Sequence, residues 1–271
     1  MLQFPDISPI ALSLGPFSFG AYTLGPLQIH WYGLTYLMGF LVAWCLGNAR
    51  CKSSTVITKE RFEVIMTYAM FGVIIGARVG YILFYDFAEF IHNPVRLFKL
   101  WQGGMSFHGG LLGVLCALWY SARKFSLRFF TVVDFVAPLV PPGLFFGRLG
   151  NFINGELWGK VTTLPWGMVF PTGGPLPRHP SQLYEALLEG LLLFTLLWIF
   201  SSKKRPTMAV SGFFAIGYGV FRSFVELFRE PDAHIGYLAG DFLTMGMVLC
   251  IPLILIGIAL LYSAYKEPRA A

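Results

Sequence analysis

Long apolar runs alternate with short polar connections along the whole chain, and this pattern predicts an all-α integral membrane protein. A helix rises about 1.5 Å per residue, so about 20 residues cross a hydrocarbon core of about 30 Å. The runs of suitable length predict seven transmembrane helices, over residues 31–47, 62–84, 107–122, 129–149, 183–200, 210–228 and 242–265. No repeat of fixed period and no linker interrupts them, so we expect one membrane domain over residues 1–271.

Two segments outside these runs are rich in turn-forming residues. Residues 1–30 contain frequent Pro, Gly and Phe and are too interrupted for a spanning helix, so we expect an arm that lies on the membrane interface. Residues 150–182 predict a small extracytoplasmic head built from turns, in which short strands could form. Within the fourth run, Pro138, Pro141 and Pro142 predict a break, which is tolerated where the freed carbonyls face protein or a cavity.

Basic residues cluster at the ends of alternate runs, and their placement predicts an orientation. Arg50 and Lys52 follow the first run, and Lys203, Lys204 and Arg205 follow the fifth. Cytoplasmic loops carry such an excess of Lys and Arg. We therefore expect the amino terminus outside and the carboxyl terminus in the cytoplasm. No Lys or Arg precedes Arg50, so the basic region of a cleavable signal peptide is missing and we expect the amino-terminal segment to be retained.

The composition agrees with a membrane protein and excludes several other classes. The chain is 56% hydrophobic and 13% charged, whereas soluble domains have about 25% charged residues. The net charge of +6 does not indicate a nucleic-acid partner, because the basic residues lie in short clusters between apolar runs. The four cysteines form no CxxC motif and have no histidine-rich spacing, so we expect neither a disulfide framework nor a metal site.

A polar cluster ends the fourth apolar run. The stretch from Gly147 to Glu156 contains Arg148, Asn151 and Asn154. A charged side chain in hydrocarbon costs at least ~2.5 kcal/mol, so such a cluster predicts a bound polar group. The planar guanidinium suits a phosphate or a carboxylate, and the glycines allow close approach of the backbone. The stretch therefore predicts an anion site at a membrane boundary.

Counting helical rise from the inner end of each run places several polar residues in one leaflet. Arg148 lies about 30 Å, Arg78 about 26 Å and His108 about 22 Å above the inner end. Arg78 near the interface could equally extend to lipid headgroups. A lone histidine usually packs in a core, but glycines on both sides of His108 clear space around its imidazole.

The sixth run carries Tyr218, Arg222, Glu226 and Arg229 at intervals of four, four and three residues, along one helix face. Arg222 and Glu226 could simply neutralise each other as a structural pair. Tyr218 on the same face favours a pocket. Both interpretations stay open from the residues alone.

Four collinear motifs resemble the bacterial prolipoprotein diacylglyceryl transferases. They are His108-Gly109-Gly110, the run Gly147 to Glu156, the segment Arg178 to Glu185, and Gly217-Tyr218-Gly219 followed by Arg222 and Glu226. The resemblance covers essentially the whole chain in order. Between residues 160 and 176 no motif matches, so the shape of the head is left open.

This resemblance implies an enzyme of the bacterial inner membrane with its active site towards the outer leaflet. Such an enzyme moves the diacylglyceryl group of phosphatidylglycerol onto the lipobox cysteine of a prolipoprotein and releases glycerol 1-phosphate, without cofactor or metal. It implies catalytic roles for His108, Arg148 and Arg222, with the arginines on the lipid phosphate. It implies a substrate site formed by Tyr32, Gly109, Asn151, Asn154, Glu156, Gly159, Tyr218 and Glu226, in which Gly109 and Gly159 are positions that need a small residue.

The residues suit this chemistry. A thiol with a pKa of about 8.5 is mostly protonated near neutrality, so a base such as His108 would help, although the field of the arginines alone could also favour the thiolate. Arginines aimed at a departing phosphate stabilise its charge. An anionic-lipid transporter or flippase is the alternative, but the polar residues crowd one leaflet and no repeat is visible. A seven-helix receptor or scaffold would leave the polar cluster without a role.

Overall fold

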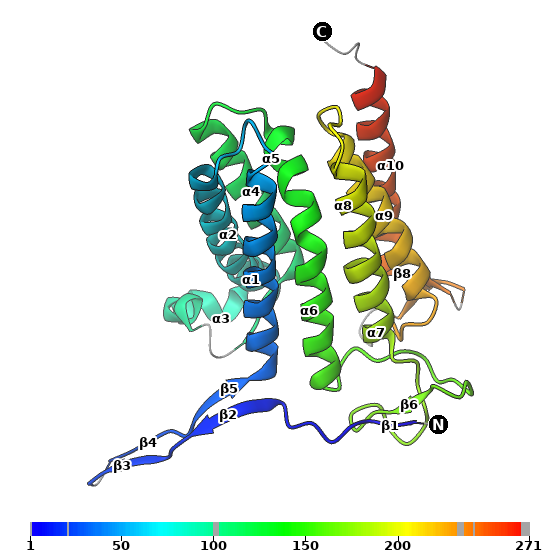
Figure 1. The fold of residues 1–271 in the computed structure, drawn as a ribbon. Coiled ribbons are helices and arrows are strands. Elements are labelled where there is room, and N and C mark those ends of the chain that lie inside the picture. Colours follow the sequence, from blue (N-terminus) through cyan, green and yellow to red (C-terminus); the bar gives the residue numbers. More distant parts are fainter. Residues whose placement is uncertain (1, 21, 100–102, 232–235, 241, 267–271) are drawn as a thin grey trace. The chain divides into compact units, whose positions relative to one another are not determined.

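The computed structural model describes residues 2–20, 22–99, 103–231, 236–240 and 242–266 (Figure 1). The chain forms two compact units, of which the first combines Met1–Cys45 with Val136–Ala271 and the second is Leu46–Phe135.

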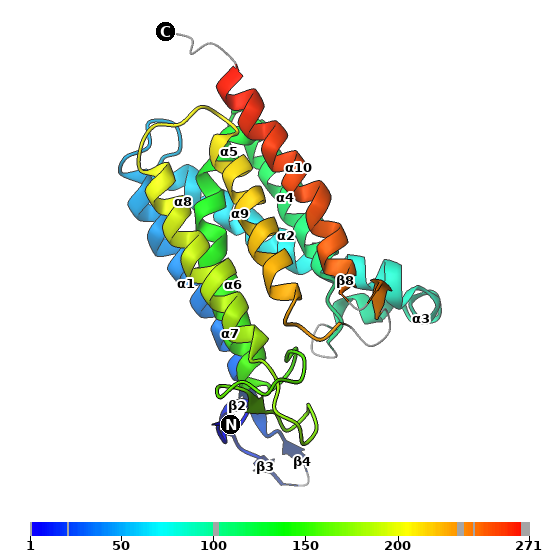
Figure 2. The same cartoon turned by 90° about the vertical axis from the view of Figure 1, so that its right-hand side faces the viewer.

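The first unit is a group of packed helices. Its helices are α1 (Trp31–Cys51, which continues into the second unit), α6 (Val140–Ile153), α7 (Ser181–Glu185), α8 (Leu193–Ser201), α9 (Ala209–Glu226) and α10 (Met245–Lys266). Helices α9 and α10 run side by side (Figure 2), and small residues let them approach. A Cβ atom on Gly212 would lie 2.8 Å from the carbonyl oxygen of Gly257. Close backbone contact at small residues is the usual way in which membrane helices pack.

The predicted proline break is confirmed. Helix α5 (Phe129–Val136) ends in the 3₁₀ turn η3 (Ala137–Leu139), and α6 begins at Val140. Pro141 and Pro142 lie in the first turn of α6, where the missing N–H groups would have no helical partner in any case. The α-helix that carries Arg148 therefore begins directly after this 3₁₀ turn.

A π-helical segment, η4 (Ala186–Leu192), separates α7 from α8. We expected one uninterrupted helix over this run, and the wider turn was not apparent from its apolar pattern. Such segments occur frequently at functional sites. Here the segment carries Glu189 and directly follows Glu185, and both side chains are fully buried.

The second unit packs α2 (Lys59–Tyr85) against α4 (Phe107–Lys124), with α5 and the short helices α3 (Phe87–His92) and η1 (Pro94–Phe98) completing it. Thr58 and Ser106 cap the beginnings of α2 and α4 with their side chains. A Cβ atom on Gly109 would lie 2.9 Å from the Cα atom of Gly80. At this point the two backbones come so close that a side chain at position 109 would not fit.

Arg78 of α2 binds backbone carbonyl groups of the segment that connects α2 to α4. Its side chain is almost buried, and it donates to the carbonyl oxygens of Leu97 at 3.3 Å and Gly104 at 3.0 Å. Further carbonyl acceptors are those of Arg96, Lys99 and Gly103. Of the two roles left open for Arg78, the structure therefore shows a specific one, because the guanidinium binds backbone oxygens of its own unit.

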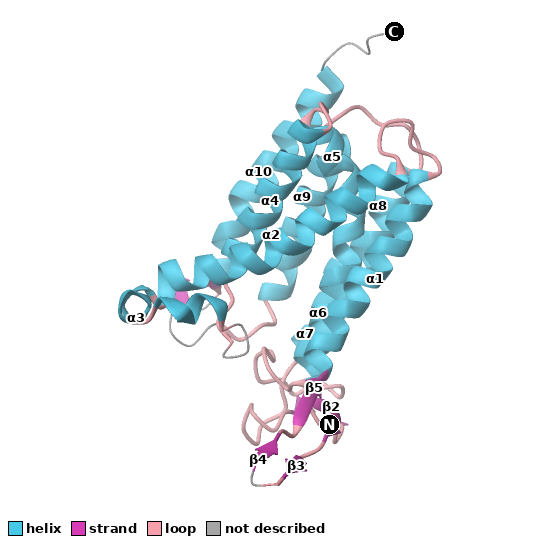
Figure 3. Cartoon of the chain, turned by 90° about the vertical axis from the view of Figure 1, so that its left-hand side faces the viewer, coloured by secondary structure: helices cyan, strands magenta, loops and turns pink. Residues whose placement is uncertain are grey.

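The all-α prediction allowed short strands only in residues 150–182, and it is too narrow, because short strands also pair elsewhere within the first unit (Figure 3). Strand β2 (Ile10–Leu14) pairs with β5 (Leu27–His30), and β3 (Phe17–Phe19) pairs with β4 (Tyr22–Leu24), both antiparallel. Strand β1 (Leu2–Gln3) pairs with β6 (Met168–Val169), and β7 (Tyr237–Ala239) with β8 (Leu243–Thr244). Segments without a helical period satisfy their backbone groups by pairing instead.

Four stretches of helix within the described ranges are long and apolar enough to cross a membrane. They are Lys59–Tyr85, Phe129–Ile153, Ser181–Ser201 and Met245–Lys266, with hydropathies from 1.6 to 2.5. The protein is therefore mostly helical, as a membrane protein of this composition should be.

Candidate active site

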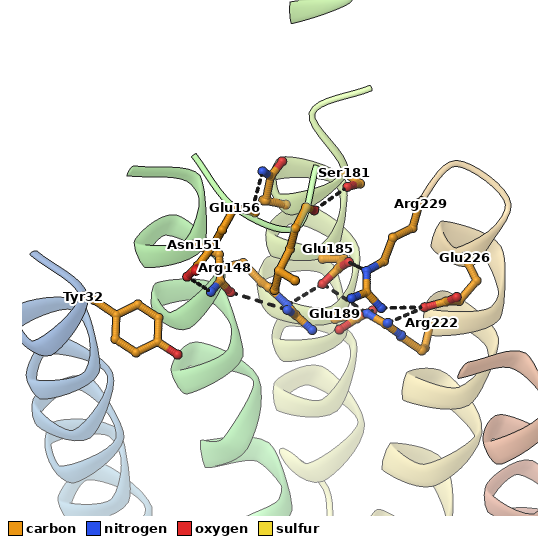
Figure 4. A network of polar contacts seen from close by, with 12 residues as sticks. Tyr32, Arg148, Asn151, Glu156, Ser181, Glu185, Glu189, Arg222, Glu226 and Arg229 are labelled. Atoms are coloured by element: carbon orange, nitrogen blue, oxygen red, sulfur yellow. Dashed lines mark hydrogen bonds and ion pairs between the residues drawn. The ribbon is translucent and has the colours of Figure 1, made fainter. Parts of the chain in front are cut away.

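Two arginines of the first unit converge on one buried carboxylate (Figure 4). The Nε atom of Arg148, on α6, forms an ion pair with Oε2 of Glu185, the last residue of α7. The Nη1 atom of Arg222, on α9, lies 3.1 Å from the same oxygen. Glu185 itself is fully buried. The structure thus brings the two predicted phosphate ligands together, and it places a carboxylate between them.

A second carboxylate, Glu226, holds the other side of Arg222. Its Oε1 atom accepts hydrogen bonds from Arg222 and, at 3.2 Å, from Nη1 of Arg229. Thr244 donates to its Oε2 atom at 2.6 Å. The structural pair that the spacing on the sixth run suggested is therefore present, but Arg222 also reaches Glu185. Pairing and participation in a shared site are both features of this arginine.

The run after Arg148 forms a connected chain of polar groups. Arg148 donates to Oδ1 of Asn151 at 3.4 Å, and Nδ2 of Asn151 donates to Oε1 of Glu156 at 2.8 Å. Asn154 donates to the same carboxylate oxygen at 3.3 Å. Arg148 and Asn151 are three residues apart and share a helix face, which explains their contact. Arg148 is half-buried and Glu156 is exposed, so this chain of polar groups runs from the half-buried arginine to the surface.

The two predicted tyrosines lie in the same unit. Tyr32 lies in the first turn of α1, and its hydroxyl is 3.2 Å from that of Tyr36. Figure 4 shows the hydroxyl end of Tyr32 directed towards α6. Tyr218 stacks on Phe214 with ring centroids 6.1 Å apart. Tyr218 also packs against the buried cluster that contains Leu193 and Val210. It therefore lies in the apolar packing around α9, one helical turn from Arg222 on the same helix face.

Gly159 lies where the head segment passes close to the end of α9. A Cβ atom there would lie 2.5 Å from the carbonyl oxygen of Phe228 and 2.7 Å from Cβ of His179. Any larger residue at position 159 would push apart the segments that contain Gly159, His179 and Phe228. His179 is 3.1 Å from the Tyr184 hydroxyl, and its pKa lies below the ordinary value because of burial, with a smaller effect of Lys160.

His108 and Gly109 belong to the second unit. His108 is exposed near the beginning of α4, and its ring meets Phe107 edge to face. The contact of Gly109 with Gly80 gives a packing reason for a small residue there. A role of His108 towards the arginines stays a prediction.

Sequence reasoning missed several members of the network. Glu185 and Glu189 are both fully buried, and Gln182 donates to the Glu156 carbonyl oxygen at 2.6 Å. The signal was available, because Glu185 and Glu189 are acidic residues four apart in an apolar run, and intramembrane acids are functional candidates by default. Thr244 gave no such signal, since a threonine at a helix start is ordinary.

The network can bind an anion, but only in competition with its own carboxylates. Preorganised guanidinium groups in a site without water stabilise developing negative charge. An incoming phosphate must take the place of Glu185 between the two arginines or share them with it. Within the described residues, no group of three or more histidine, cysteine or acidic side chains is arranged to hold a metal ion.

Comparison with known proteins relates the whole chain to one family. The family model for prolipoprotein diacylglyceryl transferase matches residues 20–263. A phosphatidylglycerol–prolipoprotein diacylglyceryl transferase of Nitratidesulfovibrio vulgaris (strain DP4) is 60% identical over 262 residues, 96% of either chain. Enzymes of the same name from Oleidesulfovibrio alaskensis (56% identical, covering 100% of this chain and 98% of the relative) and Pseudomonas aeruginosa (54% identical, covering 100% of both) are also similar.

Proposed function

This chain belongs to the prolipoprotein diacylglyceryl transferase family, and we propose that it transfers the diacylglyceryl group of phosphatidylglycerol to the thiol of a prolipoprotein cysteine, releasing glycerol 1-phosphate. The convergence of Arg148 and Arg222 on one buried carboxylate is the observation that carries the proposal, because it is where a lipid phosphate would find two guanidiniums. The names of the relatives favour this transfer over the anionic-lipid transporter that the residues left open.

In the proposed step, the cysteine sulfur attacks the methylene carbon that links the diacylglyceryl group to the phosphate. A carbon–sulfur bond forms, the carbon–oxygen bond to the phosphate breaks, and glycerol 1-phosphate leaves with the bonding electrons. Arg148 and Arg222 stabilise the charge that gathers on the departing oxygens. The thiol proton passes to a base, for which His108 is our candidate. Tyr32, Asn151, Asn154, Glu156, Tyr218 and Glu226 line the site.

The proposed topology follows the apolar runs. Seven spans would place the amino terminus, residues 1–30 and the head of residues 150–182 outside the bacterial inner membrane, with the carboxyl terminus in the cytoplasm. Helices that overlap all seven runs support this arrangement. The site would then face the outer leaflet, where it could accept phosphatidylglycerol and the lipobox cysteine of a secreted prolipoprotein.

The proposal is tested with purified protein in detergent, phosphatidylglycerol and a lipobox peptide with a free cysteine. We expect release of glycerol phosphate that requires the cysteine and is lost in Arg148→Ala. A peptide with serine in place of cysteine is the matched substrate control. If phosphatidylglycerol binds and no glycerol phosphate is released with any lipobox peptide, the transferase is the wrong function and transport becomes the better explanation.

The base assignment has a separate test. If His108 takes the thiol proton, His108→Asn should lower the rate at every pH and remove the limb of the pH–rate profile that reports the imidazole. Comparable activity with an unchanged profile would remove His108 as the base and leave thiolate formation to the arginines.

A further inference from the structure

Glu189 is a buried acid beside the arginines that the proposed reaction does not use. Its side chain is fully buried in the π-helical segment η4. Neither carboxylate oxygen accepts a hydrogen bond from a described residue, and the closest ion-pair contact is 3.7 Å, to Nη1 of Arg222. An ionised carboxylate is costly to bury without hydrogen bonds. The site therefore has a reason to keep a proton on this side chain.

A proton on Glu189 would change the net charge of the whole cluster. Among the described residues, three guanidiniums (Arg148, Arg222 and Arg229) are linked by ion pairs to three carboxylates (Glu185, Glu189 and Glu226). With every group ionised, the charges cancel, and a phosphodiester would add an uncompensated negative charge to a buried site. With Glu189 protonated, the cluster carries one positive charge, which matches the single negative charge of a phosphodiester.

We propose that Glu189 is a charge-setting residue of the anion site and that phosphatidylglycerol binds between the arginines only when Glu189 carries a proton. This rests on the proposed function, in which the arginines hold the lipid phosphate. By linkage, a proton that favours the ligand is itself favoured by the ligand, so lipid binding and protonation of Glu189 are coupled.

Other groups that face Glu189 are fixed in charge or held by stronger partners. Arg148 of α6 and Arg222 of α9 keep their charge throughout the accessible pH range. Glu226 accepts three hydrogen bonds, and Glu185 touches both arginines. The titratable and charged groups around Glu189 on the packed elements are Arg148 (α6), Glu185 (α7), Tyr218, Arg222 and Glu226 (α9) and Cys250 (α10).

The first measurement is the dissociation constant of phosphatidylglycerol for the wild-type protein in a detergent without charge, from about pH 5 to about pH 9. The phosphodiester does not titrate in this range. We expect constant affinity at the acid end and, above the titration of Glu189, a tenfold weakening per pH unit, as one coupled proton requires. An affinity that is the same across the whole range overturns the proposal, and this result does not depend on any variant folding.

The second measurement repeats the titration with Glu189→Gln, which mimics the protonated acid in size. We expect affinity that no longer changes with pH and equals the wild-type value at the acid end. Glu230→Gln is the matched control, since Glu230 pairs with Arg178 in the head, outside the cluster, and should keep the wild-type slope.

Two further outcomes separate the proposal from the function on which it rests. If Glu189→Gln keeps the wild-type slope, or if Glu185→Gln alone removes it, the proton is not on Glu189 and the inference is wrong while the transferase stands. If Arg148→Ala binds phosphatidylglycerol as tightly as the wild type, the anion site itself is wrong.

Discussion

Replacing Arg222 with lysine tests how the anion site uses its geometry. The guanidinium of Arg222 reaches Glu185 at 3.1 Å through Nη1 and pairs with Glu226 through Nη2. The proposed reaction requires the same fork to hold a phosphate. A lysine keeps the charge but ends in a compact ammonium that cannot present two parallel donors from a rigid plane. The variant therefore removes geometry and leaves the charge balance unchanged.

The expected loss follows from the contacts. A hydrogen bond to a charged group contributes about 1.5–3 kcal/mol. We expect lysine to lose one such bond to the transition state, because the charge remains and the other carboxylate contacts can adjust. Since each 1.36 kcal/mol is tenfold in rate, kcat/KM for diacylglyceryl transfer should fall by about 10-fold to 150-fold in Arg222→Lys.

The assay is the initial rate of glycerol phosphate release at several concentrations of phosphatidylglycerol. Arg128→Lys is the matched control, because Arg128 is exposed and lies outside the network, and its kcat/KM should stay within about twofold of the wild type. Thermal unfolding in detergent establishes that both variants are folded. Full kcat/KM in a folded Arg222→Lys protein would refute the idea that the planar fork holds the phosphate.

Three further predictions concern stability. Thr244→Val removes the donor to the buried Glu226 carboxylate and should lower the free energy of unfolding in detergent by about 1–3 kcal/mol; an unchanged value would mean that this bond contributes nothing net. Gly109→Leu forces side-chain atoms into the backbone of Gly80. This overpacking should destabilise the folded protein by about 1–3 kcal/mol or more and lower its unfolding midpoint. The lowered pKa of His179 means that the folded state favours the neutral ring, so its contribution to stability is full above about pH 6.5 and is lost as the pH falls towards the folded pKa. His179→Gln should therefore show a smaller loss of stability on acidification than the wild type.

Some features of this protein could be read from local residues. The apolar runs locate helices because a bilayer core leaves backbone groups no partner outside a helix, and length and hydropathy alone mark four such stretches within the described residues. The proline break before α6 follows from the missing N–H groups and the fixed φ of proline. The strands of residues 1–30 were not predicted, because β2 pairs with β5 across the intervening pair of β3 and β4, and these segments show no helical or strictly alternating period.

The candidate site, too, could be predicted from the sequence only in part. Arg148 and Asn151, like Arg222 and Glu226, could be grouped from sequence, because helical spacing puts each pair on one face. Glu156 could be grouped with Arg148 and Asn151 because it follows them closely along the chain. The convergence of these groups on Glu185 could not be predicted from the sequence, because α6, α7 and α9 are distant along the chain and only packing brings them together.

The sequence by itself therefore determined that charged residues lie within apolar helices, since the cost of burying charge makes each of them conspicuous. Tertiary structure alone decided the partners. It put Glu185 between two arginines and left Glu189 beside Arg222 without a hydrogen bond from any residue that the structure describes. The physical reason is that the net charge of a buried site adds up side chains from several helices that pack against one another. A local pattern in the sequence shows the charges of one helix only.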